Sequence, residues 1–457
     1  MRVLVCGATG CVGTAVANAL RSRGHTVVAG ARRAGGGRDS LQLDFMQPVE
    51  PAAWRDRLRE RRIDAVVNCV GILMASRTQS FERIHTAGPV ELFRGAAQAG
   101  VARVVQISAL GVDDDAAALA SPYLHSKRCA DDALAALTID AAVLRPSLVF
   151  GPNSQSGALF ATLASLPLIG LPGRGRQRVQ PLHVFELAEA VVRLLEQDQP
   201  CRGVYMLGGA AALSYREMLA QYREALQLGA PLWLPLPMPL MRVAAWAAEA
   251  LPQKVFCRDT IAMLERGSVP ADNAAPRLLG RAPSSLAHGL AVTPPQGWID
   301  LRVEMPPAVA LALRLSIVAM WWITALVTTL MPEASGVLRL LARCGFDGRA
   351  GVAVMIASCT LNTVLGTLLL RRPAPWVWPL QIAAVLGYTL TAAINMPELT
   401  LDHCGPLLKN VPLIALMTVL WLAQPWRDVV AAQRSPRRAT PAARGGPDRP
   451  ALRIARD

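Results

Sequence analysis

Residues 1–13 read MRVLVCGATGCVG, a short apolar run that passes directly into a glycine-rich loop. The run has the length and composition of a buried parallel strand, and the stretch TAVANALRSRG after the loop has a helical pattern. Glycines between a strand and a helix let the chain turn tightly, bring backbone N–H groups close to a pyrophosphate and pack the helix on the strand. We therefore predict a dinucleotide-binding loop at Gly7, Gly10 and Gly13.

Five further apolar runs alternate with helical stretches up to about Leu207, and this alternation predicts a Rossmann-like α/β fold with a doubly wound parallel sheet. The runs are HTVVAGA, DAVVNCVG, ARVVQISA, AAVLRPSLVF and GVYMLGG. After residue 231 the pattern changes to pieces rich in proline and alanine, such as PLWLPLPMPLMRVAAWAAEAL. These pieces predict an amphipathic helix or a small substrate lobe. We assign residues 1–300 to the Rossmann-like domain and residues 208–300 to its lobe.

Four apolar segments follow residue 306, at 307–331, 351–370, 374–396 and 411–426. The second and third carry no charged residue and are long enough to cross a bilayer core of about 30 Å. The first carries only Arg314, and the fourth is short and has Pro412 in its first turn. We predict an all-α bundle of four transmembrane helices over residues 306–426.

The composition agrees with a membrane location, because 52% of the residues are hydrophobic and the net charge is +14. Much of the positive charge is arginine next to the apolar segments and in the last thirty residues, which indicates membrane topology rather than a nucleic-acid partner. An even number of spans would leave both termini and the Rossmann-like domain in the cytoplasm, at a bacterial-type inner membrane. Residues 427–457 are rich in arginine and proline, and we expect a disordered basic tail that attracts anionic lipid.

This orientation divides the basic residues unequally. The cytoplasmic side would carry Arg302, Arg314, Arg371, Arg372, Arg427, Arg434, Arg437, Arg438 and Arg444, and the outer side only Arg339, Arg343, Arg349 and Lys409. The strand-like N-terminus is also unlike a secretory signal, so we expect it to stay inside.

The nine cysteines show neither a C-x-x-C pair nor the spacing of metal ligands. We expect reduced thiols in the cytoplasmic domain and no metal site. Cys344 and Cys404 fall in the two loops predicted to lie outside, where a disulfide and two free thiols are both open alternatives.

The end of the second strand run indicates which dinucleotide is bound. An acidic residue there would hold the ribose 2′-hydroxyl of NAD, but this chain has Arg32 and Arg33. Guanidinium groups suit a 2′-phosphate, so NADP(H) is preferred and NAD(H) is the second choice. The alternative is that both arginines are ordinary surface residues.

The segments GATGCVG, LDF, VVNCVG, VVQISALG and YLHSK together resemble the atypical and extended branches of the short-chain dehydrogenase/reductase superfamily. The resemblance extends to the branch that includes the nucleotide-binding accessory subunit of respiratory complex I. It implies that Asp44 borders the adenine and that the loop from Asn68 to Gly71 passes the nicotinamide ribose. A plain turn is the alternative role for Asp44. The cofactor-binding set is Gly7, Thr9, Gly10, Val12, Gly13, Arg32, Arg33, Asp44, Asn68, Gly71, Lys127 and Pro146.

Tyr123 and Lys127 are four residues apart in a helical stretch, so their side chains share one face. A nearby ammonium favours the phenolate and would lower the pKa of Tyr123, which makes this residue a candidate acid/base. Ser108, at the end of a strand run, would hydrogen-bond the substrate oxygen, and the resemblance implies that Lys127 also reaches the ribose. The alternative is a retained set without activity.

Two later segments extend this site. The turn RPSLVFGP resembles the RPxxxxGP turn of extended members, which places Pro146 and Ser147 at the nicotinamide and substrate pocket. In QPLHVFELAEAVVRLL, His183 is either a site residue or a simple capping and packing residue.

The apolar segments resemble the DoxX-like families of four-helix membrane proteins, through GPLLKNVP and WWITALVTTLMPEAS. This resemblance suggests a quinone or another lipid-soluble partner. Polar residues in spans are costly, so they mark either a site or helix packing. They are Asn362, Asn395, Lys409 and Asn410.

Three functions are compatible with these observations. The first is an NADP(H)-dependent oxidoreductase or epimerase acting on a small hydrophobic substrate delivered from membrane lipid. The second is an NADP(H)-binding scaffold or assembly factor without turnover. The third is a transporter with a nucleotide sensor, which the lack of acidic residues in the spans disfavours.

Overall fold

The computed structural model describes residues 1–33, 37, 39–115, 121–249, 255–297, 305–333, 336–370, 374, 376–396 and 407–423. Several expectations lie outside these residues. They concern the basic tail 427–457, Cys404 with its pairing to Cys344, and Arg302, Arg371 and Arg372.

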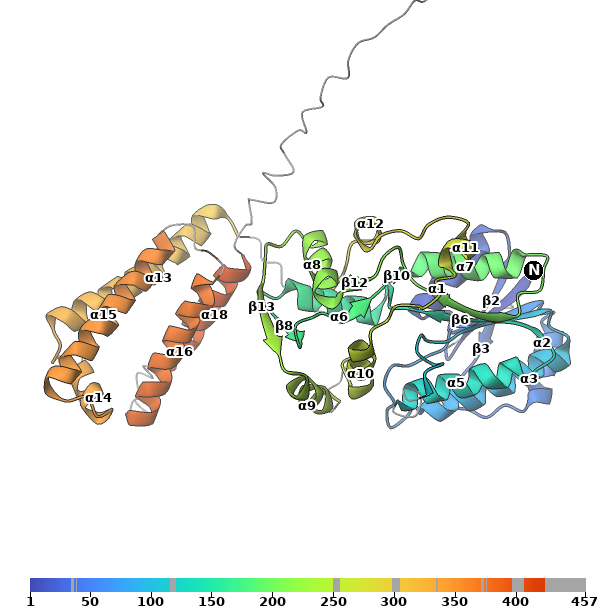
Figure 1. Cartoon of the computed structure of the whole chain (residues 1–457), viewed down its shortest axis with the longest axis horizontal. Coiled ribbons are helices and arrows are strands. Elements are labelled where there is room, and N and C mark those ends of the chain that lie inside the picture. Colours follow the sequence, from blue (N-terminus) through green and yellow to red (C-terminus); the bar gives the residue numbers. More distant parts are fainter. Residues whose placement is uncertain are drawn as a thin grey trace, which may run out of the picture. The chain divides into compact units, whose positions relative to one another are not determined.

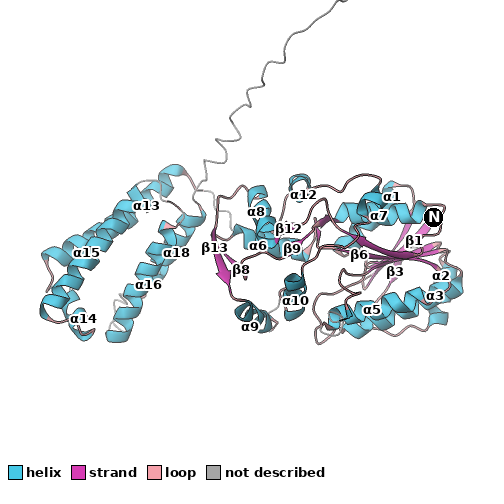
Figure 2. Cartoon of the chain, viewed as in Figure 1, coloured by secondary structure: helices cyan, strands magenta, loops and turns pink. Residues whose placement is uncertain are grey.

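Within the described residues, seven strands form one sheet in the order β11-β6-β5-β4-β1-β2-β3, and every neighbouring pair is parallel (Figures 1 and 2). The strands are β1 (Arg2–Cys6), β2 (Thr26–Ala31), β3 (Ser40–Gln42), β4 (Ala65–Asn68), β5 (Arg103–Ile107), β6 (Asp140–Pro146) and β11 (Gly203–Leu207). All six predicted strands are present, and β3 is additional. The chain reverses its direction of winding between β1 and β4, which is where ligands bind in such sheets.

Helices cover both faces of the sheet (Figure 1). Successive β1 side chains point to opposite faces, so Val3 and Val5 pack in one core while Leu4 and Cys6 pack in the other. The first face carries α1 (Cys11–Ser22) and α7 (Val184–Glu196), and the second carries α2 (Pro51–Glu60), α3 (Gly88–Ala99) and α5 (Pro122–Ala135). A short π-helix, η1 (Glu82–Ala87), leads into α3. The predicted doubly wound fold is confirmed.

A separate core forms the lobe, and it takes residues from before position 208 as well as after it. Phe150, Phe160 and Ile169 pack there with Tyr215, Met218 and Tyr222. The lobe's helices are α6 (Gln155–Ser165), α8 (Tyr215–Ala225), α9 (Met238–Ala248), α10 (Arg258–Arg266) and α12 (Leu286–Val292). Its strands pair as β8 (Leu168–Pro172) with β13 (Leu232–Leu236), and β9 (Arg178–Val179) with β12 (Leu213–Ser214). The chain crosses between the domain and its lobe more than once.

The proline-rich segment that begins at residue 231 forms a strand, which is followed by a helix. LWLPL forms β13, which pairs in parallel with β8, while the amphipathic helix expected in this region is α9. Pro235 is compatible with β13 because β13 pairs with one strand alone in a two-stranded sheet. A proline, which has no backbone N–H, is tolerated on the unpaired edge of such a strand.

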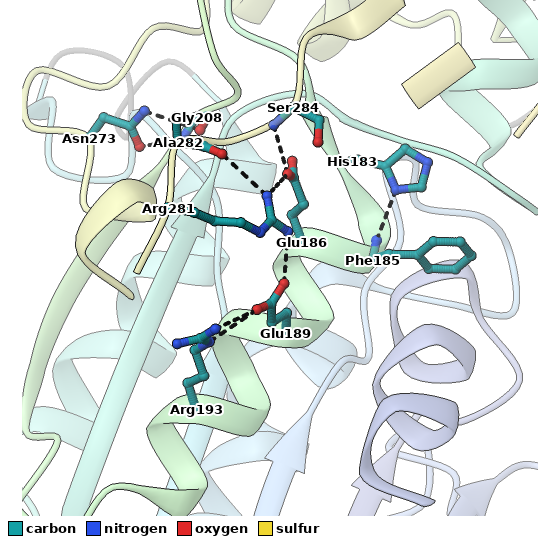
Figure 3. Close-up of polar contacts among 10 residues, drawn as sticks. All are labelled: His183, Phe185, Glu186, Glu189, Arg193, Gly208, Asn273, Arg281, Ala282 and Ser284. Atoms are coloured by element: carbon teal, nitrogen blue, oxygen red, sulfur yellow. Dashed lines mark hydrogen bonds and ion pairs between the residues drawn. The ribbon is translucent and has the colours of Figure 1, made fainter. Parts of the chain in front are cut away.

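After the lobe core the chain returns to the sheet domain at α11 (Ala275–Leu279), whose Ala275 and Leu279 join the core under α7. Figure 3 shows the ion pairs that hold the next turn on α7. The Arg281 guanidinium donates to Glu186 and Glu189, each at 2.8 Å, and the Ser284 N–H also donates to Glu186. A further short pair of strands, β7 (Val149–Phe150) and β10 (Leu182–His183), leads into α7.

The C-terminal region is helical. Its helices are α13 (Pro307–Leu330), α14 (Val337–Arg343), α15 (Gly348–Leu370), α16 (Val377–Asn395) and α18 (Asn410–Leu422). Among the described residues, α13, α15 and α16 are long and apolar enough to cross a membrane, and α18 is a shorter apolar helix. Many large apolar side chains on these helices are exposed, including Ile323, Leu390 and Ile394, as expected of surfaces that face lipid. The short helix α14 was not expected from the sequence.

Polar side chains inside this bundle bond to one another. The Trp321 indole donates to Gln381 at 2.9 Å, and the Gln381 amide donates to the Leu365 carbonyl at 3.0 Å. The Tyr388 hydroxyl donates to Asn362, and Asn410 donates to Thr389. These bonds favour the packing role for Asn362 and Asn410.

Candidate functional site

The glycine loop after β1 has the shape that its sequence requires. Gly7 has a φ of +74°, and the Gly10 N–H donates to the Gly7 carbonyl at 2.9 Å. A side chain at Gly13 would place its Cβ 2.1 Å from the Gly7 carbonyl oxygen, so only glycine allows α1 to approach the loop. The N-cap of α1 is Gly10, whose lack of a side chain leaves the first N–H groups open to an anion. The loop therefore fits a pyrophosphate.

A cavity of about 1700 Å³ lies at the carboxyl ends of the strands and continues into the lobe. Most of the predicted site residues line it: Gly7, Thr9, Gly10, Val12, Arg32, Asp44, Gly71, Ser108, Tyr123, Lys127, Pro146 and Ser147. Gly13, Arg33, Asn68 and His183 are not among its lining residues. One cavity thus joins the glycine loop to the Ser108, Tyr123 and Lys127 side chains.

Asn68 has a structural position instead of a place in the cavity wall. It is fully buried, its amide donates to Gln106 at 2.8 Å, and its side-chain oxygen accepts from the Val70 N–H at 3.2 Å. These bonds fix the start of the loop that carries Gly71 into the cavity wall. The direct cofactor role expected for Asn68 is not supported by this geometry.

Lys127 lies on α5 and ties two strand ends together. Its ammonium donates to the Ile107 carbonyl at 3.0 Å and to the Val70 carbonyl at 3.3 Å. Burial lowers the pKa of Lys127 to about 8, although Asp131 opposes this shift. The cation is therefore placed at the ends of β4 and β5, beside Gly71.

Tyr123 lies one helical turn before Lys127, but its pKa differs from the expectation. Burial raises this pKa to about 12, and the charges of Asp131 and Asp259 add to the rise. The expected lowering by Lys127 is wrong for this structure, because desolvation of the phenolate and the charges of two carboxylates raise the pKa, while the ammonium bonds to backbone carbonyls. At neutral pH the phenol of Tyr123 keeps its proton.

Ser108 is held by a buried ion pair that the sequence reasoning missed. Its hydroxyl donates to Asp131 at 2.6 Å, and Arg145 from β6 donates to the same carboxylate oxygen at 3.3 Å. Burial raises the pKa of Asp131, while Ser108 and Arg145 oppose that rise. Asp131 stands four residues after Lys127 on the same helix face, a spacing that could have identified it.

His85, on η1, is a second residue that the sequence reasoning missed. Its Nε2 accepts from the Ile72 N–H at 3.0 Å, and its Nδ1 lies 3.0 Å from the Ser126 hydroxyl. The ring stacks on Phe81 and meets the ring of Tyr123 edge-on. Burial, and then the charge of Lys127, lower the pKa of His85 to about 2, so the ring is neutral. The segment RIHTAG contains no pattern that would have singled out this histidine.

The residues expected at the adenosine end differ in their positions. Arg32 and Arg33 are both exposed, but only Arg32 lines the cavity. Asp44 lines the cavity and also accepts from the Met46 N–H at 3.0 Å. The turn role of Asp44 is therefore present, together with a position that a cofactor could contact.

His183 is the N-cap of α7. Its Nδ1 accepts from the Phe185 N–H at 3.2 Å, as Figure 3 shows, and its Nε2 lies 2.8 Å from the Thr293 hydroxyl. The capping and packing alternative is confirmed.

Comparison with known families agrees with this geometry. Residues 3–208 match the NAD dependent epimerase/dehydratase family, and residues 318–418 match the DoxX-like family. The chain joins an epimerase/dehydratase domain to a DoxX-like domain. The DoxX-like match and the long apolar helices make it a membrane-associated protein.

Individual relatives of the epimerase/dehydratase domain are named for different functions. An Arabidopsis thaliana protein named NADH dehydrogenase [ubiquinone] 1 alpha subcomplex subunit 9 is 28% identical over 59% of this chain and 71% of its own length. UDP-glucose 4-epimerase of Vibrio cholerae is 25% identical over 52% of this chain and 79% of its own length. Ceramide reductase of Caulobacter vibrioides is 27% identical over 42% of this chain and 59% of its own length.

Solved structures with a similar fold include MoeE5 in complex with UDP-glucuronic acid and NAD. It has a TM-score of 0.49 and 21% sequence identity, and the match covers 64% of this chain and 97% of that chain.

Proposed function

We propose that the epimerase/dehydratase domain binds a nicotinamide dinucleotide and interconverts an alcohol and a carbonyl group on a hydrophobic substrate. The observation that carries this proposal is the shared cavity, in which Ser108, Tyr123 and Lys127 line the same space as the glycine loop. Lipids and quinones are the substrate classes that suit a membrane-associated chain.

The cofactor would be held by the chain's own backbone and by two cations. The loop from Gly7 to Gly10 and the open N-terminus of α1 would bind the pyrophosphate, and Lys127 would reach the nicotinamide ribose. When bound, the nicotinamide supplies the hydride donor or acceptor. Arg32 would contact a ribose 2′-phosphate, which is our reason to propose NADP(H) over NAD(H) in a family described as NAD dependent.

Tyr123 is suited to give a proton to a substrate carbonyl oxygen. The phenol is protonated at neutral pH, and the rise of its pKa to about 12 makes the loss of that proton less favourable. The ammonium of Lys127 would stabilise the phenolate that remains. Because the hydroxyl proton of Ser108 is donated to Asp131, the Ser108 oxygen would accept a hydrogen bond from a substrate hydroxyl group.

The lobe side of the cavity supports an apolar substrate. Many of the lobe residues along it are hydrophobic, and they include Leu159, Leu163, Leu236, Met241, Phe256 and Met263. A nucleotide sugar carries a diphosphate that needs cationic or amide donors. The same wall includes Arg266, Asn153 and Gln155, which offer such donors, so our choice of a lipid rests on the hydrophobic residues and on one relative that is named for the reduction of a ceramide.

The second candidate function is an NAD(P)-binding scaffold without turnover. The hydroxyl proton of Ser108 already bonds to Asp131, and the relative from Arabidopsis thaliana is named as a subunit of NADH dehydrogenase. In this case the cavity would bind the cofactor to stabilise the domain, and Tyr123 would be dispensable.

Replacing Tyr123 with Phe separates the two candidates. In the full chain reconstituted in vesicles, Tyr123→Phe should retain NADPH binding by fluorescence and lose at least about a hundredfold of NADPH oxidation with ketolipids or quinones. Tyr215→Phe is the matched control, because Tyr215 also lines the cavity and is buried, but in the lobe. Equal turnover in the two variants would contradict the role of Tyr123, whereas NADPH binding without NADPH oxidation in the unaltered chain would contradict the enzymatic proposal and favour the scaffold.

We also propose the membrane orientation inferred from the arginine distribution, with the epimerase/dehydratase domain and both termini in the cytoplasm. That side would supply reduced nicotinamide cofactor to the domain.

A further inference from the structure

Helix α9 has two different apolar sides. Met241, Ala244 and Ala248 line the cavity, whereas Leu240, Val243 and Trp246 are 53%, 60% and 63% exposed. At 3.6 residues per turn these two sets are centred roughly 130° apart around the helix axis. Helix α9 is thus a partition between the substrate cavity and the exterior, with apolar side chains on each side.

Exposed apolar side chains also occur on the strand that precedes the helix and on its partner strand. Leu234 on β13 and Leu168 on the paired strand β8 are also exposed. Contiguous exposed apolar surface on a folded domain usually marks an interaction site, and a tryptophan among aliphatic residues is typical of the membrane interface.

The charge next to α9 indicates what this surface meets. The turn that follows β8 contains Arg174 and Arg176, and the Gly173 N–H in this turn donates to the Leu236 carbonyl directly before α9. Both arginines are exposed, and neither forms an ion pair with a residue that the structure describes. Exposed cations beside an apolar helix face complement anionic lipid headgroups.

The chain also restricts how far the domain can move from the bilayer. Gly297 and Met305 are the described residues on either side of residues 298–304, and α13 begins at Pro307. Eight residue steps span at most about 28 Å when fully extended. The lobe is therefore tethered close to the lipid surface that its apolar helix face could enter.

We propose that α9 lies in the interface of the bilayer, with Leu240, Val243 and Trp246 inserted among the lipids and Arg174 and Arg176 at the headgroups. The side of α9 that lines the cavity then lies one helix thickness from the acyl chains. A lipid-soluble substrate can enter around α9 without crossing water. The proposed membrane interface does not depend on the proposed enzymatic function, whereas the proposed entry route for the substrate rests on that function.

The test uses the full chain reconstituted in vesicles of phosphatidylcholine with phosphatidylglycerol. The photo-crosslinking amino acid p-benzoyl-phenylalanine replaces Trp246 in one sample and Val204 in the control, because Val204 on β11 is 51% exposed and lies in the sheet domain. We expect about tenfold more lipid adduct at Trp246 than at Val204, measured by mass spectrometry. Equal lipid adduct at both positions, or a protein adduct at Trp246 in place of lipid, would overturn the proposal.

A second arm tests the electrostatic contribution. Arg174→Gln with Arg176→Gln should reduce the lipid adduct at Trp246 in the vesicles that contain phosphatidylglycerol and leave it unchanged in pure phosphatidylcholine. An equal reduction in both vesicles would show that the arginines act on the fold, and it would contradict their role at the headgroups. Crosslinking needs no turnover, so an inactive protein with a strong adduct at Trp246 would disprove the enzymatic function and keep the interface.

Discussion

At the scale of single residues, the candidate site depends on groups that the YxxxK pattern does not contain. Asp131 fixes Ser108 and raises the pKa of Tyr123, while His85 holds the Ile72 N–H and packs against the Tyr123 ring. Burial raises the pKa of Tyr123 and of Asp131 and lowers the pKa of His85. Two predictions belong to this scale.

The first prediction concerns the acid stability of the domain. The pKa of His85 falls from 6.5 to about 2 on folding, so the unfolded chain binds one more proton than the folded chain between these values. Titration of His85 therefore has no effect on folding above pH 6.5, and it increasingly destabilises the folded state as the pH falls below 6.5. His85→Gln should remove up to about 1.4 kcal/mol per pH unit of this dependence.

The measurement is the denaturant unfolding free energy of the full chain in detergent between pH 7 and pH 5. His25→Gln is the control, because the His25 ring forms an exposed contact with Glu196. An unchanged slope in His85→Gln would contradict the assignment of a buried neutral imidazole.

The second prediction concerns the choice between cofactors. Arg32 lines the cavity and Arg33 does not, so Arg32→Ala should weaken NADPH binding about tenfold and leave NADH binding unchanged. Arg33→Ala should change neither. Fluorescence titration of the two variants provides the comparison, and equal affinities of the unaltered protein for NADPH and NADH would rule out the 2′-phosphate contact.

At the scale of elements, one arginine joins two neighbouring strands of the sheet to a helix that packs on one face of it. Arg103, at the start of β5, donates to Asp140 on β6 at 2.7 Å and to the Leu194, Leu195 and Gln197 carbonyls at the end of α7. The guanidinium satisfies the carbonyl groups that every helix leaves open at its C-terminus.

The corresponding prediction is that Arg103→Ala lowers the free energy of unfolding by about 3 kcal/mol, because it removes the donor to one carboxylate oxygen of Asp140 and to several carbonyl groups. Arg202→Ala is the control, since this exposed arginine bonds only to the Ala135 carbonyl among the described residues. A loss below about 1 kcal/mol for Arg103→Ala would place the contact among ordinary surface ion pairs.

At the scale of the whole molecule, an epimerase/dehydratase domain is attached to apolar helices, and the orientation of these helices determines which compartment supplies the cofactor. The arginine distribution predicts that reporters fused after residues 372 and 426 are both cytoplasmic. The short helix α18 is the element on which this prediction depends, because it has only 13 residues. A periplasmic reporter after residue 426 with a cytoplasmic one after residue 372 would mean that α18 does not cross the bilayer.

The sequence by itself determined the local features of this protein. Glycine spacing predicts the loop from Gly7 to Gly13, apolar runs predict the strands of the sheet, and uncharged segments predict the membrane helices, because each of these signals lies within a short stretch of chain. The spacing of Tyr123 and Lys127 likewise places both on one face of α5.

Only the tertiary structure decided the chemistry of the site. His85, Ser126 and Asp131 come together with Ser108 and Tyr123 because η1, α5 and the ends of β4 and β5 meet at one edge of the sheet. The pKa of Tyr123 follows from burial and from the carboxylates Asp131 and Asp259, which are 8 and 136 residues away in the chain. Desolvation depends on everything packed around a group, so no local pattern of residues predicts it.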